Sequence, residues 1–278
     1  MARGGPIPAA HPPFEDSMLE IDFAELSDVG RVRAENEDCL GHVAPDTPEQ
    51  ARSHGWLFAV ADGVGGHEKG EVASRTAIEA VVDGFREANR GEPLSGLLEK
   101  LVRRANTRVL DAGMNSGMAT TLVVCALRYD RAVIAHVGDS RCYLIRGKTA
   151  TPLTRDHTIA NEHARLGLLS SDEIAGAETR HILSRSLGTA LSVNVEMSDH
   201  QVLPGDVLLL CSDGLHGALS REEIATVVSE TTDVELAARR LVALANEKDG
   251  SDNVSAQVVR VQNVERVGMY RGRPYKLR

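Results

Sequence analysis

The sequence predicts an α+β fold in which antiparallel β-sheets are covered by helices. Short apolar runs separated by tight turns indicate many strands, while two pairs of amphipathic stretches indicate helices after the early strands and again near the end. The chain has 278 residues, of which 42% are hydrophobic, and this is enough for a sizeable core. Because no internal linker interrupts the pattern, we expect one domain over residues 18–262.

The first third of the chain is expected to supply an arm and three strands. Residues 1–17 are rich in Pro, Gly and Ala and should form a loose arm. Alternating apolar and polar residues over 19–26 predict a half-buried strand, and a second strand is expected at about 39–43. Residues 44–55 are predicted to be a polar loop. The apolar run over 56–62 then predicts a strand buried on both faces.

Two helices and three strands are expected next. One helix follows Gly70, and the other starts near Pro93, a residue that suits the first helical position. Both place apolar side chains on one stripe, so they should cover a face of a sheet. Strand-like runs follow at 119–128, 132–137 and 141–146. Because tight turns join these runs, we expect an antiparallel meander.

The second half begins with a long polar stretch at residues 154–189. It has no strand pattern and is predicted to be an irregularly helical excursion outside the sheets. The remaining elements are expected in this order: strands at 194–203 and 206–210 around a Pro204-Gly205 turn, helices at 221–229 and 234–247, and a last strand at 253–262. Residues 263–278 form a basic tail that we expect to be a flexible end.

Composition excludes several classes of protein. A net charge of −9 argues against a nucleic-acid binder, and no apolar run has the length of a membrane span or of a signal-peptide core. We therefore expect no nucleic-acid and no membrane partner, a cytoplasmic location and a monomer. The cysteines lie apart, without metal-ligand spacing, and are expected to be free thiols in a reducing compartment. They are Cys39, Cys125, Cys142 and Cys211.

Four acidic residues lie at the ends of predicted strands. Asp62, Asp139 and Asp213 each come just after an apolar run, and Asp252 comes just before one. Asp-Gly after a strand is often only a turn, but the repetition changes the interpretation. If these strands are neighbours, their ends gather negative charge that protons or cations must compensate. Oxygen ligands without a matching Cys or His set favour Mg²⁺ or Mn²⁺ over zinc.

A series of short motifs runs through the whole chain in a characteristic order. These motifs are R-x-x-N-E-D at 33–38, V-A-D-G-V-G-G-H at 60–67, T-T at 120–121, H-V-G-D-S-R at 136–141, L-T-x-D-H-T at 153–158, L-L-C-S-D-G-L at 209–215 and D-N-V at 252–254. Each is weak alone. In this order and spacing, over about residues 21–261, they resemble the metal-dependent PP2C-type (PPM) Ser/Thr protein phosphatases in their bacterial form.

The resemblance implies a β-sandwich of two antiparallel sheets flanked by helices on both sides, with two Mn²⁺ or Mg²⁺ ions and a third at one end. Carried over motif by motif, it implies that Asp62 bridges the two main ions. It implies that Asp213 and Asp252 hold the first of these ions, and that Glu37 and the carbonyl of Gly63 hold the second. It further implies that Asp38 fixes metal-bound water and that Asp139 with Asp213 holds the third ion. It also implies that Arg33 binds the substrate phosphate, and we expect His67 and Asn253 beside the substrate.

The implied activity is hydrolysis of phosphoserine and phosphothreonine by direct attack of a metal-bridging water or hydroxide. Arg33 suits phosphate binding because a guanidinium can hold two phosphoryl oxygens as a planar fork. The expected partners are phosphorylated proteins, including a cognate Ser/Thr kinase, since the motifs favour a phosphatase that opposes bacterial kinases. The stretch 154–189, the flap segment, resembles the flap subdomain of the family.

The sequence departs from the family pattern at two positions. Eukaryotic members have a His, proposed as the general acid, where Val64 stands here, and His67 cannot be assumed to take over that role. Ala119 replaces a glycine that commonly precedes the paired threonines, which we expect to affect packing only.

Three other functions compete with this interpretation. The first is a phosphatase of the same fold that acts on an anti-sigma-factor antagonist, and the second is a catalytically weak fold used for binding, which the complete set of acidic residues argues against. The third is a nucleotide-binding module built on the glycine loop. It fails on spacing, because Lys69 precedes Gly70 and no G-x-x-x-x-G-K-[ST] sequence is present.

Overall fold

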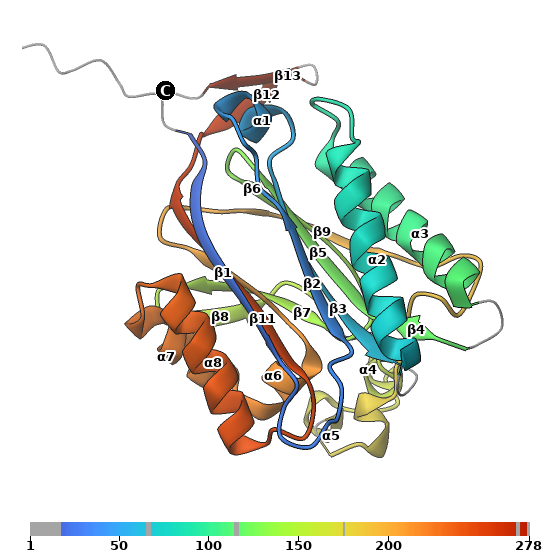
Figure 1. The fold of residues 1–278 in the computed structure, drawn as a ribbon. Coiled ribbons are helices and arrows are strands. Elements are labelled where there is room, and N and C mark those ends of the chain that lie inside the picture. Colours follow the sequence, from blue (N-terminus) through green and yellow to red (C-terminus); the bar gives the residue numbers. More distant parts are fainter. Residues whose placement is uncertain (1–17, 65–67, 114–116, 175, 271–272, 277–278) are drawn as a thin grey trace, which may run out of the picture.

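The computed structural model describes residues 18–64, 68–113, 117–174, 176–270 and 273–276. It shows two antiparallel sheets packed face to face (Figure 1). The five-stranded sheet has the order β1 (Glu20–Asp28), β11 (Val254–Asn263), β10 (Val207–Cys211), β7 (Arg141–Arg146) and β8 (Thr149–Pro152). The six-stranded sheet has the order β2 (Asp38–Val43), β3 (Trp56–Val64), β5 (Leu122–Arg128), β6 (Arg131–Val137) and β9 (Glu196–Gln201), and β4 (Ala119–Thr120) pairs with β3.

Helices cover the outer face of each sheet (Figure 1). The six-stranded sheet packs against α2 (Glu68–Arg86) and α3 (Leu94–Gly113), and the five-stranded sheet packs against α7 (Arg221–Glu230) and α8 (Val234–Lys248). A third apolar cluster fills the space between the sheets. The predicted β-sandwich flanked by helices on both sides is therefore confirmed.

Strand β3 shows why its sequence is apolar at successive positions. Phe58 and Val60 point into the core between the sheets, whereas Leu57, Ala59 and Ala61 belong to the core beneath α2 and α3. Strands in the middle of a four-layer structure bury both faces, so the usual alternation of apolar and polar residues disappears.

The predicted meander over residues 119–146 is wrong in one respect. Strands β5 and β6 form a hairpin of the six-stranded sheet, but β7 lies in the five-stranded sheet next to β10. The chain crosses between sheets at Gly138, whose φ of +104° is a conformation that L residues rarely adopt. The strands around Pro204-Gly205 separate in the same way, since β9 pairs with β6 and β10 pairs with β7 and β11.

Several elements were not expected from the sequence. The predicted polar loop at 44–55 contains α1 (Pro48–Ser53), whose start is capped by the Thr47 hydroxyl accepting from the Gln50 amide at 3.2 Å. The predicted flexible tail instead contains a hairpin of β12 (Val267–Tyr270) and β13 (Arg273–Lys276). The short elements β8 and α6 (Asp213–Ala218) also had no clear pattern.

The described part of the flap segment combines short helices with irregular stretches, which agrees with the predicted irregularly helical excursion. It contains α4 (Ile159–Arg165), α5 (Ser171–Ile174) and the 3₁₀ turn Glu178–His181, and it lies at one end of the sandwich (Figure 1). Among all the helices of the described ranges, none is both long and apolar enough to span a bilayer.

Candidate metal centre

Strand ends from both sheets meet at one cleft of about 710 Å³. Asp62 on β3 pairs in register with Asp38, the first residue of β2. Asp139 follows β6, Asp213 follows β10 as the first residue of α6, and Asp252 comes shortly before β11. The predicted site residues that line the cleft are Arg33, Glu37, Asp62, Gly63, Asp139, Asp213, Asp252 and Asn253. Residues spread over most of the chain are thus brought to one place.

The paired threonines hold the backbone of Asp62. The Asp62 carbonyl accepts from the Thr121 amide at 2.9 Å and from the Thr120 hydroxyl at 2.8 Å. The Asp62 amide donates to the Thr121 hydroxyl at 3.0 Å. These contacts fix the backbone of Asp62 and therefore the direction of its side chain.

The start of α2 packs against the carboxyl group of Glu37. A Cβ atom added at Gly70 would lie 2.7 Å from Glu37 Cδ, and one added at Gly63 would lie 2.2 Å from the Gly70 carbonyl oxygen. The contact at Gly63 is with backbone atoms, so glycine is needed there for the start of α2 to lie this close to β3. At Gly70, a Cβ atom would require the end of the Glu37 side chain to shift.

Asp38 lies behind the cleft and is held by two serines that sequence reasoning missed. Its Oδ2 accepts from the Ser212 hydroxyl at 2.7 Å, and that hydroxyl accepts from the Ser255 amide at 3.0 Å. Its other oxygen, Oδ1, is buried and accepts no hydrogen bond from the described residues. A buried carboxylate oxygen without a partner is costly, which suits a bound water or cation at this position.

Burial and mutual repulsion raise the pKa values of the acidic group. Burial raises the pKa of Asp38 to about 7, and the charges of Asp213 and Asp252 add to the rise. Burial, reinforced by the charge of Asp213, likewise raises the pKa of Asp139 to about 7. The pKa of Asp62 lies well above its ordinary value, because desolvation of the carboxyl group and the charges of the other aspartates disfavour its ionised form. Without cations these carboxyl groups cannot all carry charge.

The donors fit the predicted hard cations. The acidic side chains of the cleft offer carboxylate oxygens, which suit Mg²⁺ or Mn²⁺. The buried Asp38 Oδ1 and the tightly packed Glu37 carboxyl group are consistent with a site shaped around a ligand, and the assignment of ions to individual residues stays a prediction.

The raised pKa values predict an unusual pH dependence of stability in chelator. Asp38 keeps its proton in the folded state up to about pH 7, whereas unfolded aspartate loses it near about pH 4. Because the folded state binds more protons in this window, its stability falls as the pH rises through it. Asp38→Asn has no charge to bury, so the difference between its melting temperature and that of the wild type should shift in favour of the variant as the pH rises from about 4 to about 7.

Comparison of the wild type with Asp38→Asn separates the contribution of Asp38 to stability from that of three histidines. Burial lowers the pKa values of His136, His157 and His216. Their contribution to the stability of the folded protein is therefore lost as the pH falls, which is the opposite dependence. The histidines are present in both proteins, so they cancel in the difference. A difference in melting temperature that is constant with pH would contradict the proposed protonation of Asp38.

Arg33 lies at the rim of the cleft on the loop between β1 and β2. Its Nη2 donates to Asp252 Oδ2 at 2.9 Å, and its side chain is 47% exposed. A guanidinium with five N–H groups retains donors for a second acceptor. Arg33 is thus available to an anion that enters the cleft. His67, which is also expected beside the substrate, lies outside the described residues.

Asn253 ties the β1–β2 loop to the site. Its Oδ1 accepts from the Glu37 amide at 2.8 Å, and its Nδ2 donates to the carbonyls of Val29 and Glu35, each at 2.9 Å. Both amide hydrogens are therefore engaged with backbone. This supports a role in shaping the loop, and the expected contact with substrate stays a prediction.

The flap segment contributes cleft residues that no sequence motif indicated. They are His181, Ile182, Leu183, Ser186 and Thr189. The available signal was the resemblance of the whole segment to the flap subdomain of the family, which did not single out these residues.

Comparisons with known proteins agree with this geometry. The family model described as "Protein phosphatase 2C" matches residues 24–254. The serine/threonine phosphatase stp of Listeria welshimeri is 33% identical over 254 residues, covering 89% of this chain and 96% of that protein.

Two solved structures are similar throughout the fold. The S. agalactiae serine/threonine phosphatase superposes with a TM-score of 0.80 at 29% identity, covering 87% of this chain and 100% of the other. The catalytic domain of the serine/threonine protein phosphatase PstP, in complex with two manganese ions, gives 0.75 at 32% identity, covering 88% and 100%. The chain therefore belongs to the protein phosphatase 2C family, and it is a metal-dependent serine/threonine protein phosphatase.

Proposed function

We propose that the cleft hydrolyses phosphoserine and phosphothreonine without a side-chain nucleophile, on proteins phosphorylated by bacterial Ser/Thr kinases. The observation that carries this proposal is the convergence of five aspartates and Arg33 at one end of the sandwich. When bound, two Mn²⁺ or Mg²⁺ ions, with a third held more weakly, supply an activated water and positive charge opposite the phosphate.

The residues divide this work as follows. Asp62 would hold both ions of the pair, Asp213 and Asp252 would contribute to one site, and Glu37 with the Gly63 carbonyl would contribute to the other. Asp139 and Asp213 would hold the third ion. Asp38, oriented by Ser212, accepts a hydrogen bond from water in the cleft and keeps it directed at phosphorus. Arg33 binds phosphoryl oxygens and aligns the phosphate for in-line attack.

The cysteines are poorly suited to act as nucleophiles. Burial raises the pKa of Cys39 and brings that of Cys211 to about 12. The pKa of Cys142 is also raised, through its neighbour Cys125 and burial. Thiols with raised pKa values stay protonated at neutral pH and react slowly. This supports direct attack by water.

The kinase-opposing role is favoured over the alternatives by the complete site. Arg33 and Asp139 both line the cleft, as expected for a protein phosphatase with a third ion. We propose a cytoplasmic monomer whose substrates include a cognate Ser/Thr kinase. The same fold acting on an anti-sigma-factor antagonist is the second candidate.

The test is dephosphorylation of defined phosphoproteins in Mn²⁺. An autophosphorylated bacterial Ser/Thr kinase should be a better substrate, by kcat/KM, than a phosphorylated anti-sigma-factor antagonist. The reverse order would favour the second candidate, and no release of phosphate from either protein or from p-nitrophenyl phosphate would support a binding role.

A further prediction concerns the flap segment. Leu166 and Leu168 are 63% and 67% exposed, and the segment also lines the cleft, so it offers apolar contacts to a protein substrate. Shortening the connection between Leu166 and Glu178 should lower kcat/KM on phosphoproteins at least ~10-fold and on p-nitrophenyl phosphate less than ~3-fold, because remote contacts affect large substrates only. Equal effects on both substrates, or none, would indicate a tolerated surface insertion.

A further inference from the structure

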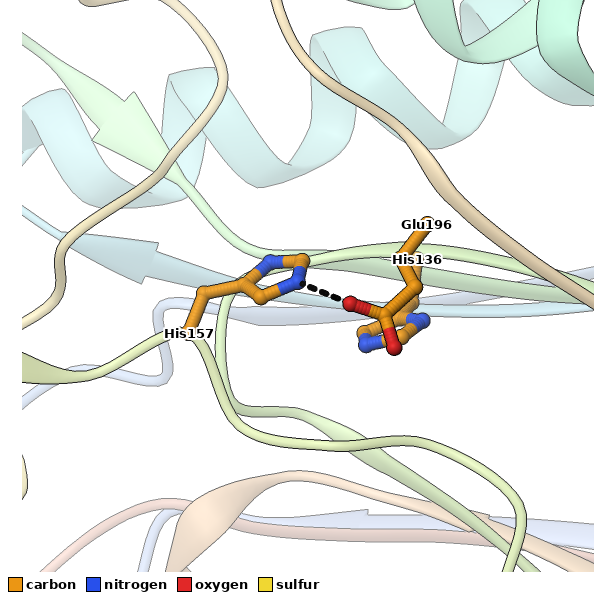
Figure 2. A group of neighbouring side chains, drawn as sticks. All are labelled: His136, His157 and Glu196. Carbon is orange, nitrogen blue, oxygen red and sulfur yellow. Dashed lines mark hydrogen bonds and ion pairs between the residues drawn. The ribbon is translucent and has the colours of Figure 1, made fainter. Parts of the chain in front are cut away.

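Figure 2 shows a cluster of two buried histidines, His136 and His157, with the half-buried Glu196, and these residues have no assigned role. His136 is on β6, Glu196 is the first residue of β9, and His157 lies in the connection between β8 and α4. The two imidazole rings stack with centroids 4.7 Å apart and planes inclined by 12°. At first sight, two histidines and a carboxylate indicate a transition-metal site.

The hydrogen bonds of the rings exclude a metal role for His157. Its Nδ1 accepts from the Gly138 amide at 3.1 Å, so the ring proton is on Nε2, which donates to Glu196 Oε2 at 3.2 Å. A neutral imidazole has a single lone pair, and here the backbone amide uses it. His136 Nε2 faces the Arg155 carbonyl at 2.9 Å and must also donate. Too few free lone pairs remain to coordinate an ion.

His157 instead holds the residue that precedes Asp139 from two directions. Besides accepting the Gly138 N–H with its ring, it donates its own backbone N–H to the Gly138 carbonyl at 2.9 Å. Gly138 has a φ of +104°, and an added Cβ would lie 2.6 Å from Thr121 Cβ, so this turn has a single tight conformation. On the far side, the Asp139 carbonyl accepts from His216 Nε2 at 2.9 Å.

The same residue also joins the two ends of the flap segment. The His157 carbonyl accepts from the Ser184 amide at 2.8 Å. The next residue, Thr158, caps α4 and forms an isolated β-bridge with Leu183, which lines the cleft. A single residue therefore touches the turn that carries Asp139 and both ends of the flap segment.

We propose that His157 is a positioning residue, which orients Asp139 toward the cleft through the Gly138 backbone, and that Glu196 fixes its ring by accepting the Nε2 proton. His157 touches neither substrate nor metal. The proposal rests on the proposed role of Asp139 in holding the third ion. It implies that the flap segment and the Asp139 site are coupled, so that a change in one alters the other.

Two substitutions in the full chain separate the contacts of the ring. In His157→Asn, the amide oxygen takes the place of Nδ1 and can still accept the Gly138 N–H, but the side chain is too short to reach Glu196. In His157→Gln, the longer side chain can reach Glu196, but the Gly138 N–H loses its acceptor. Asp139→Ala gives the full effect of losing the carboxylate.

Calorimetric titration with Mn²⁺, together with kcat and KM on a phosphopeptide, measures the outcome. His157→Gln should resemble Asp139→Ala: the tight pair of ions stays bound, the weakest binding event weakens at least ~10-fold, and kcat falls with little change in KM, as for loss of a ligand's supporting contact. His157→Asn should stay within ~3-fold of the wild type in both measurements. Glu196→Ala should fall between them.

The results distinguish failure of the proposal from failure of the assigned Asp139 role. If Asp139→Ala matches the wild type in Mn²⁺ binding and turnover, Asp139 has no such role and the proposal falls with it. If Asp139→Ala is impaired but the two His157 variants are equal, or Asn is worse than Gln, then His157 does not act through Gly138. Thermal unfolding in chelator checks that every variant is folded, and a general loss of structure shared by both His157 variants would equally overturn a specific positioning role.

Discussion

Asp62→Asn is expected to lower turnover at least ~10³-fold, on the scale of removing one part of a cooperating catalytic unit. Asp62 is half-buried, its backbone is fixed by Thr120 and Thr121, and it faces the other aspartates of the cleft. The substitution removes the carboxylate that we propose holds both ions, while conserving the size of the side chain. Asp213→Asn should give a similar loss. Rates at saturating Mn²⁺ and the bound metal content measure both effects.

Folding and charge can be controlled in this experiment. Asp199→Asn removes an exposed carboxylate on β9 that pairs with Arg131, and it should leave turnover unchanged. In chelator, Asp62→Asn should melt no lower than the wild type, because it removes a group whose charged form is unfavourable in the metal-free protein. Full activity of the wild type in excess chelator would overturn the metal mechanism.

Arg33→Ala is expected to lower kcat/KM on a phosphopeptide by ~10² or more, the scale observed for loss of one preorganised hydrogen-bond donor to a reacting group. Arg33→Lys should recover only part of this loss, because an ammonium is a point charge and cannot hold two phosphoryl oxygens as a planar fork. The Michaelis constant should rise and turnover should fall in both variants.

Arg31 provides the matched control on the same loop. Its side chain is exposed and has no assigned role, so Arg31→Ala changes the net charge equally without removing the contact with phosphate. If this variant loses as much activity as Arg33→Ala, then the loop acts through general electrostatic attraction. Wild-type kinetics in both Arg33 variants would show that Arg33 does not bind the phosphate.

Much of the fold could be predicted because local patterns report burial directly. The helical stripes of α2 and α3 and the apolar run of β3 each require a buried face, and their predicted ends lie within a few residues of the observed ones. Helix α1 was missed because its six residues contain a single buried side chain, Ala51, and so have no apolar stripe.

The candidate site was predicted for a related reason. Carboxylates at strand ends have a fixed position relative to the strand, so a repeated Asp after apolar runs indicates a common edge. Ser212, Ser255 and His157 could not be recognised in this way, because a serine or histidine in a strand end or loop has many possible partners. Ser212 bonds to Asp38, Ser255 to Ser212 and His157 to Gly138, and all of these bonds depend on contacts between distant segments.

The sequence by itself determined where the long strands and helices lie, which faces they bury, and which acidic residues lie at the strand ends. Only the tertiary structure decided which sheet each strand joins, placing β6 and β7 in opposite sheets although three residues separate them. The physical reason is that backbone hydrogen bonds are the same for every strand pair, so pairing is chosen by packing and by turns such as Gly138. The cleft exists because both sheets end at the same place, and that depends on the whole chain.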